Sequence, residues 1–191
     1  MAIELEAKIR LDDVAAVRAT LLEIGASKLG HRLELNIYFD TTDRKLLAGD
    51  EGLRIRSIWS LDGNSAAAAK HVITFKGRQE AGSALKSREE IEFNVDQNEP
   101  ATELLKRLGY HAELGFEKRR ESWSFAGCAI ELDELPLLGT FVEVEGPSRD
   151  AVMGTLSKLD LGARPLITES YISMMSREAT RLGLHDRVVR F

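Results

Sequence analysis

Charged and apolar residues alternate in several short stretches of this chain. In the first, Ile3-Glu4-Leu5-Glu6-Ala7-Lys8-Ile9, every second residue is charged. Successive side chains of a β-strand point to opposite faces, so the charges share one face and the apolar residues share the other. One such strand indicates only a sheet with one wet face. Here the pattern recurs with both signs of charge, at Arg54 and Arg56, Lys76, Arg88, Glu90 and Glu92, Lys118 and Arg120, Glu131 and Asp133, and Glu143 and Glu145.

The periodicities predict eight strands and about four helices. Strands are expected at 2–11, 32–40, 52–60, 70–77, 87–95, 113–125, 128–134 and 139–146, and helices at 14–22, 99–108, 149–160 and 169–182. Strands that follow one another through short turns pair antiparallel, and eight is the number at which a barrel closes around side chains or one small ligand. The predicted fold is α+β and mainly β, a closed eight-stranded antiparallel barrel with helices packed outside.

In such a barrel the apolar faces lie outward under the helices, and the charges line the interior. Carboxylates such as Glu4, Glu6, Glu143 and Glu145 are hard oxygen ligands that suit magnesium or manganese. Arginine guanidinium groups suit two-point contacts with phosphate. The two sets neutralise each other until metal and substrate enter. The pattern therefore predicts a site for a metal and a polyanion that is spread over the whole fold.

Composition excludes several other classes of protein. The chain has 191 residues, one domain or slightly more, and its net charge of −5 argues against a general nucleic-acid binder. The single Cys128 excludes an internal disulfide framework, and the four histidines lack the spacing of a zinc site. No apolar run approaches the roughly 18 residues of a membrane span. We expect a cytoplasmic protein without a signal peptide and without a membrane partner.

The charged segments occur in a recognisable order. They are Glu4-x-Glu6-x-Lys8, Tyr38-Phe39-Asp40, Leu53-Arg54-Ile55-Arg56, Thr74-Phe75-Lys76-Gly77, Arg88-Glu89-Glu90, Lys118-Arg119-Arg120, Asp133, Leu138-Gly139-Thr140-Phe141-Val142-Glu143-Val144-Glu145 and Ser170-Tyr171. This series resembles the CYTH superfamily, the triphosphate tunnel metalloenzymes. Its layout is most similar to the class IV adenylyl cyclase-like branch, which is related to the thiamine triphosphatases. We expect a single domain of this family over 1–183 and a C-terminal tail over 184–191.

The resemblance implies a role for each matching residue. It implies a homodimer and Mg2+ or Mn2+ as cofactor, with a small-molecule triphosphate as substrate. The implied metal ligands are Glu4, Glu6, Asp133, Glu143 and Glu145. The implied triphosphate-binding residues are Lys8, Arg54, Arg56, Lys76, Arg88, Lys118 and Arg120. The implied catalytic residues are Glu4, Glu6, Lys8 and Glu90, the last either orienting a basic neighbour or positioning the nucleophile.

One departure from the family pattern bears on the reaction. Class IV cyclases carry a His-Phe pair shortly before the first motif, where this chain has only Met1-Ala2-Ile3. Two reactions share the predicted site: attack of the ATP 3′-hydroxyl on the α-phosphorus, which forms cyclic AMP, and attack of water on the γ-phosphorus. The substrate is ATP, thiamine triphosphate or tripolyphosphate. The alternative is a non-catalytic polyphosphate- or nucleotide-binding module, against which the retained carboxylates Glu4, Glu6, Glu143 and Glu145 argue.

Overall fold

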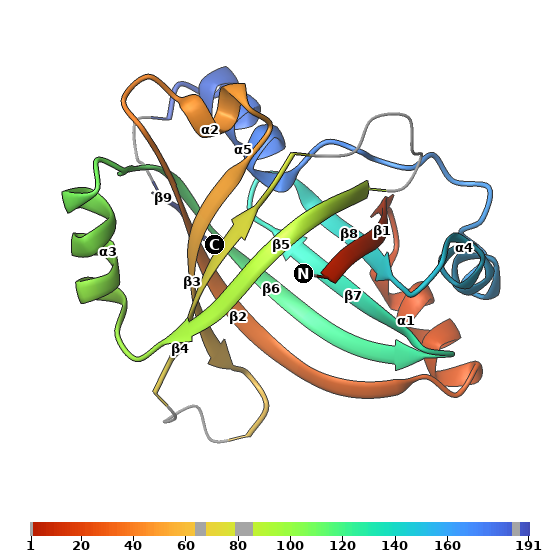
Figure 1. Cartoon of the computed structure of the whole chain (residues 1–191). Coiled ribbons are helices and arrows are strands. Elements are labelled where there is room, and N and C mark those ends of the chain that lie inside the picture. The colour runs from red at the N-terminus through yellow and green to blue at the C-terminus, as the bar shows by residue number, and fades with distance from the viewer. Residues whose placement is uncertain (1, 64–67, 79–85, 185–187) are drawn as a thin grey trace.

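A long, strongly bent sheet with helices around it forms the chain (Figure 1). The computed structural model describes residues 2–63, 68–78, 86–184 and 188–191, with the backbone alone at 2–4, 86 and 87. The strands are β1 (Ala2–Leu11), β2 (Ser27–Asp40), β3 (Gly52–Ser60), β4 (Lys70–Lys76), β5 (Lys86–Val95), β6 (His111–Phe125), β7 (Cys128–Leu135), β8 (Gly139–Glu145) and β9 (Val188–Val189). The helices are α1 (Val14–Glu23), α2 (Lys45–Ala48), α3 (Asn98–Arg107), α4 (Arg149–Lys158) and α5 (Tyr171–Arg181).

The sheet is mainly antiparallel, as predicted. Its strand order is β2-β3-β4-β5-β1-β8-β7-β6-β9, and only the short β9 pairs parallel, with β6. In addition β2 pairs with β6, from Ser27 opposite Ser124 to Asp40 opposite His111. Each strand from β1 to β8 therefore has a hydrogen-bonded neighbour on both sides.

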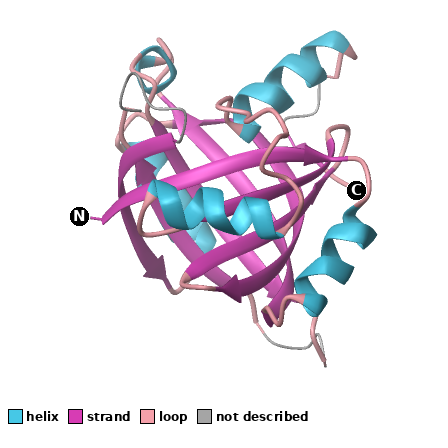
Figure 2. Cartoon of the chain, turned by 90° about the vertical axis from the view of Figure 1, so that its right-hand side faces the viewer, coloured by secondary structure: helices cyan, strands magenta, loops and turns pink. Residues whose placement is uncertain are grey.

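The apolar outer face of the sheet lies under helices, which confirms the predicted direction of the alternation. Ile9 of β1 packs in one cluster with Leu21 of α1 and Leu156 of α4. On another part of the sheet, Ile55 of β3 packs with Leu105 of α3. Figure 2 shows helices lying on the outside of the strands. The charged residues that alternate with this outer face are thereby directed inward.

The α5 helix lies with α2 at one end of the sheet (Figure 1). Its Tyr171 and Met175 pack against Phe116 and Phe141. Phe116 shares the inner face of β6 with Lys118, and Phe141 shares that of β8 with Glu143, two residues further along each strand. Apolar side chains therefore fill the inside of the sheet beside the charged region.

Three elements differ from the prediction. The β2 strand begins at Ser27, before the expected 32–40, and its register shifts between Lys28 and Gly30, which interrupts the alternation. The α2 helix is too short to show a period, and the Asp40 carboxylate holds it by accepting from the N–H groups of Leu46 and Leu47. The two-residue β9 likewise gives no periodic signal. None of the helices in the described part of the chain has the length and apolar character needed to cross a membrane.

Candidate functional site

A cavity of about 540 Å³ opens on the inner face of the sheet. All of the predicted triphosphate-binding residues line it: Lys8, Arg54, Arg56, Lys76, Arg88, Lys118 and Arg120. The predicted carboxylates Glu6, Glu90, Glu143 and Glu145 line it too, together with Glu92, Tyr38, Ser170 and Tyr171. The backbone pairs Glu4 with Arg88, but the Glu4 side chain lies outside the described part. The alternation thus brings basic groups from β1, β3, β4, β5 and β6 to one space.

A second cavity, of about 670 Å³, lies between α2 and α5. Its wall includes the apolar side chains of Leu46, Leu114 and Ile172, and it meets the first cavity at Tyr38. None of the predicted site residues lines it. The smaller, charge-lined cavity is therefore the candidate site.

Asp133 holds two of the basic groups in place. Arg120 of β6 and Asp133 of β7 are register partners. Arg120 donates from Nε to Oδ1 at 2.6 Å and from Nη2 to Oδ2 at 2.5 Å. Lys118 Nζ lies 3.3 Å from the same Oδ2. Asp133 is 1% exposed and is not part of the cavity wall. Its predicted role as a metal ligand stays a prediction, and the contacts favour a role in positioning Arg120.

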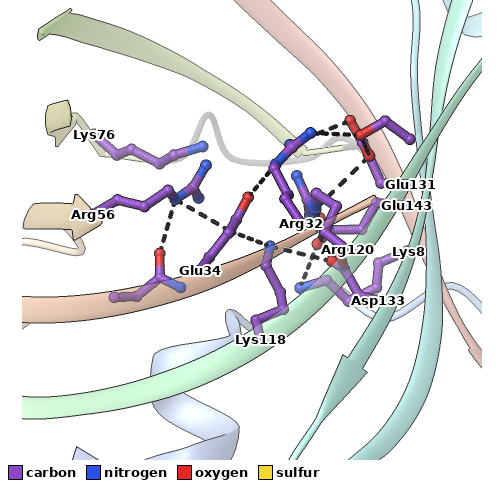
Figure 3. Close-up of polar contacts among 12 residues, drawn as sticks. Lys8, Arg32, Glu34, Arg56, Lys76, Lys118, Arg120, Glu131, Asp133 and Glu143 are labelled. Carbon is purple, nitrogen blue, oxygen red and sulfur yellow. Dashed lines mark hydrogen bonds and ion pairs between the residues drawn. The ribbon is translucent and has the colours of Figure 1, made fainter. Parts of the chain in front are cut away.

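Glu34 is a site residue that the sequence reasoning missed. Its side chain is fully buried on β2, with Oε1 2.8 Å from Arg32 Nε and Oε2 3.3 Å from both Arg56 Nε and Lys118 Nζ. Figure 3 shows it between Arg56 and Lys118. The signal was available, because Glu34, Asn36 and Tyr38 alternate with the apolar residues of this strand.

Burial and charge act in opposite directions on these groups. Burial by itself raises the pKa of Glu34, but the surrounding cations, Arg56 foremost, bring it well below its ordinary value. Burial and the neighbouring Arg120 lower the pKa of Lys118. Burial would also lower the pKa of Arg120, yet the Asp133 carboxylate raises it well above its ordinary value. An anion in the cavity would favour the charged form of Lys118.

The acidic side of the cavity is formed by β1 and β8. Glu6 and Glu145 are register partners on these strands, as are Lys8 and Glu143. Lys8 Nζ lies 3.3 Å from Glu143 Oε1, and Arg120 Nη2 lies 2.6 Å from Glu143 Oε2. Elsewhere in the wall Lys76 pairs with Glu90 at 3.0 Å. The predicted basic residues and the carboxylates Glu6, Glu90, Glu143 and Glu145 therefore line the same cavity.

The residues present fit a hard divalent cation in their chemistry. Glu6 and Glu145 lie directly opposite each other on neighbouring strands, and carboxylate oxygens are ligands for such a cation. Among the side chains that the structure describes, no group of three His, Cys, Asp or Glu residues is arranged to hold a metal ion. A full ligand set at this pair would need groups beyond those side chains, such as Glu4, water or substrate oxygens.

Comparison with known proteins identifies relatives of this chain. The sequence model of the CYTH domain matches residues 2–155. A candidate adenylate cyclase of Methanocaldococcus jannaschii is 29% identical over 181 residues, which cover 90% of this chain and 98% of that protein.

Two of the solved structures that share the fold illustrate the likeness. A candidate adenylate cyclase of Vibrio parahaemolyticus has a TM-score of 0.78 at 21% identity, over 91% of this chain and 98% of that one. The adenylyl cyclase candidate HpAC1 of Hippeastrum, described as having a dominant triphosphatase activity, has a TM-score of 0.67 at 22% identity. That alignment covers 94% of this chain and 96% of the other.

Proposed function

Because this chain belongs to the CYTH domain family, we propose that it binds a triphosphate with Mg2+ or Mn2+ in the charge-lined cavity and hydrolyses it. One observation carries the proposal: basic side chains from β1, β3, β4, β5 and β6 meet in a cavity of about 540 Å³. A phosphate chain presents several anionic oxygens in a row. Basic side chains that come from separate strands can contact different phosphate groups of the same chain.

The cavity acts, in this proposal, as a closed tunnel. The pairing of β2 with β6 supports closure, because it joins the first and last of the eight long strands in the sheet order. A tunnel without a free edge fixes the distances between the basic groups. Such preorganised charges stabilise a transition state without rearranging during the reaction.

Phosphoryl transfer requires mainly positioning and charge neutralisation. Arg54, Arg56 and Lys118 bind the phosphate oxygens, while Asp133 and Glu34 hold the basic side chains around them. Glu6 and Glu145, together with Glu4 and Glu143 two residues away on the same strands, would hold the metal ion, which would supply a Lewis acid for the scissile phosphate. Water attacks the terminal phosphorus, and the bond to the bridging oxygen breaks. The water oxygen stays on the released phosphate, its protons pass to the products and to solvent, and the shortened chain leaves.

Hydrolysis is favoured over cyclisation by the composition of the wall. Among the described residues that line the cavity, the uncharged ones are Tyr38, Ser170 and Tyr171. A wall that is mostly charged recognises a phosphate chain, and the apolar side chains of the second cavity lie outside it, beyond Tyr38. Cyclisation needs the ribose to be held in line with the α-phosphorus. The activity ascribed to the Hippeastrum protein, which shares only the fold at 22% identity, points in the same direction.

Cyclisation of ATP is the second candidate function. It is favoured by the name of the M. jannaschii relative, an adenylate cyclase candidate that covers 90% of this chain. Both reactions use the same phosphate contacts, and only the position of the nucleophile separates them.

A product analysis tests the proposal. The protein is incubated with tripolyphosphate, ATP or thiamine triphosphate, each with Mg2+, Mn2+ or EDTA, and phosphate, diphosphate and cyclic AMP are separated. We expect metal-dependent release of phosphate. Cyclic AMP at a rate comparable to total ATP consumption contradicts hydrolysis and favours the cyclase. Tight binding without turnover of any substrate would indicate the binding module.

A further inference from the structure

Tyr171 is the first residue of α5, and it brings that helix to the wall of the charge-lined cavity. The residue is 8% exposed. Its hydroxyl is buried and has no hydrogen-bond partner among the described residues. A buried hydroxyl without a partner lowers stability. Because Tyr171 lines the cavity, a ligand bound there is a candidate partner for this hydroxyl.

The ring of Tyr171 also contacts two of the predicted phosphate-binding lysines. Lys8 Nζ of β1 lies 3.8 Å from the ring centroid, and Lys118 Nζ of β6 lies 5.4 Å from it. Both distances allow cation–π attraction. Lys8 Nζ in addition donates to the carbonyl of Glu169, two residues before Tyr171. The ring therefore contacts ammonium groups from two different strands, and the start of α5 is tied to one of them.

The hydroxyl of Tyr171 keeps its proton at neutral pH and can therefore donate a hydrogen bond. Burial raises the pKa of the phenol well above its usual range, and the carboxylates of Asp133 and Glu143 raise it further. The N-terminus of α5, capped by Ser170, adds the positive end of a helix dipole at the same point.

We propose that Tyr171 is a substrate-binding residue, whose hydroxyl donates a hydrogen bond to a phosphate oxygen that Lys8 and Lys118 attract into the charge-lined cavity. The inference rests on the proposed function. A phosphate oxygen carries a negative charge, which attracts both ammonium groups. It also accepts a hydrogen bond from the hydroxyl, which has no other acceptor among the described residues. The ring would in turn keep the two lysines in place before the substrate arrives.

The Tyr171→Phe variant separates these roles, because it removes the hydroxyl and keeps the ring. In the ligand-free protein we expect an unchanged or higher melting temperature, since an unpaired buried hydroxyl is lost. We expect the Kd for tripolyphosphate to rise about 10-fold to 100-fold, the range for a hydrogen bond to a charged group. Tyr110→Phe is the matched control, because Tyr110 packs in the outer cluster with Phe39 and Leu105, and it should leave the Kd unchanged.

The outcomes distinguish this inference from the proposed function. A wild-type protein that binds no tripolyphosphate contradicts both. Wild-type binding that Tyr171→Phe matches, or a variant that loses stability but keeps its affinity, contradicts this inference alone.

A second measurement does not depend on the variant being well folded. The three tyrosines are replaced by 3-fluorotyrosine in the wild-type chain, and fluorine resonances are followed during titration with tripolyphosphate. We expect the Tyr171 resonance to shift with the binding isotherm while that of Tyr110 does not. A Tyr171 resonance that stays in place at saturation contradicts the proposal.

Discussion

Arg120 and Asp133 face each other across β6 and β7 and make a two-point contact, with hydrogen bonds of 2.6 and 2.5 Å. The same carboxylate lies 3.3 Å from Lys118. All three side chains are buried. If the Asp133 carboxylate is replaced by a neutral group, the buried cations of Arg120 and Lys118 lose the negative charge that balances them.

Replacing Asp133 by Asn should therefore lower the free energy of unfolding by about 3–5 kcal/mol, the usual cost of removing one partner from a buried pair. Urea denaturation followed by circular dichroism measures it. Glu134→Gln is the control, because Glu134 forms an exposed pair with Arg119 on the same strands, and its cost should stay below about 1 kcal/mol. Unchanged stability with a loss of metal binding would instead assign Asp133 to the metal.

Glu6→Gln should abolish turnover, because the neutral amide binds a divalent ion more weakly than the carboxylate does. Binding of tripolyphosphate should become weaker but remain measurable, since the basic wall is intact. Activity as a function of Mn2+ concentration and calorimetric binding test the two parts. Glu89→Gln, an exposed change on β5, serves as control. Full turnover by Glu6→Gln/Glu145→Gln, or by the wild type in EDTA, would refute the metal site.

Arg56→Ala should weaken binding of tripolyphosphate by about 1.5–3 kcal/mol, the value of a hydrogen bond to a charged group. Calorimetry on the variant and on Arg119→Ala provides the comparison. Arg119 is the neighbour of Lys118 and Arg120 that faces outward, with a half-exposed side chain, so its removal should have no effect on affinity. A loss as large for Arg119→Ala as for Arg56→Ala would contradict the assignment of the inner face.

Affinity should fall from tripolyphosphate to diphosphate to phosphate. The basic groups come from several strands, and a shorter chain reaches fewer of them. Competition titrations with the three anions under one set of conditions measure the order. Equal affinity for phosphate and tripolyphosphate would mean that the basic groups do not act on one ligand.

Stability at acid pH should depend on Glu34. Its pKa in the folded protein is well below the ordinary value of 4.5. The unfolded chain therefore takes up a proton that the folded one does not, and the contribution of Glu34 to stability is lost as the pH falls below 4.5. Glu34→Gln should be less stable at pH 7, by about 3–5 kcal/mol, and the difference should shrink on acidification. Identical pH profiles for wild type and variant would contradict this.

The alternation of charge and apolar residues was sufficient to predict most strands and the inner face. The bounds of β1 and β3 agree with the expected 2–11 and 52–60, because both strands have an outer face under helices and a charged inner face. Elements without a period, α2 and β9, gave no signal.

The pairing of charges within the site was not accessible from periodicity. Arg120 meets Asp133 because the β6–β7 hairpin turns at Ala126 and Gly127, both with positive φ, and this turn sets the register. The contact between Lys8 and the ring of Tyr171 brings together residues more than a hundred and sixty positions apart in the chain. Such contacts depend on how the helices dock.

The buried Glu34 affects how the binding of an anion in the cavity would depend on salt. Four cations, Arg32, Arg56, Lys118 and Arg120, act on this one carboxylate. The cavity thus carries its own counterions as part of the covalent chain, and it has less need to gather small anions from the buffer. An anionic ligand would then bind to cations that are already partly balanced by Glu34, and few dissolved anions would have to leave. The affinity of such a site falls less steeply with added salt than that of a basic patch on an open surface.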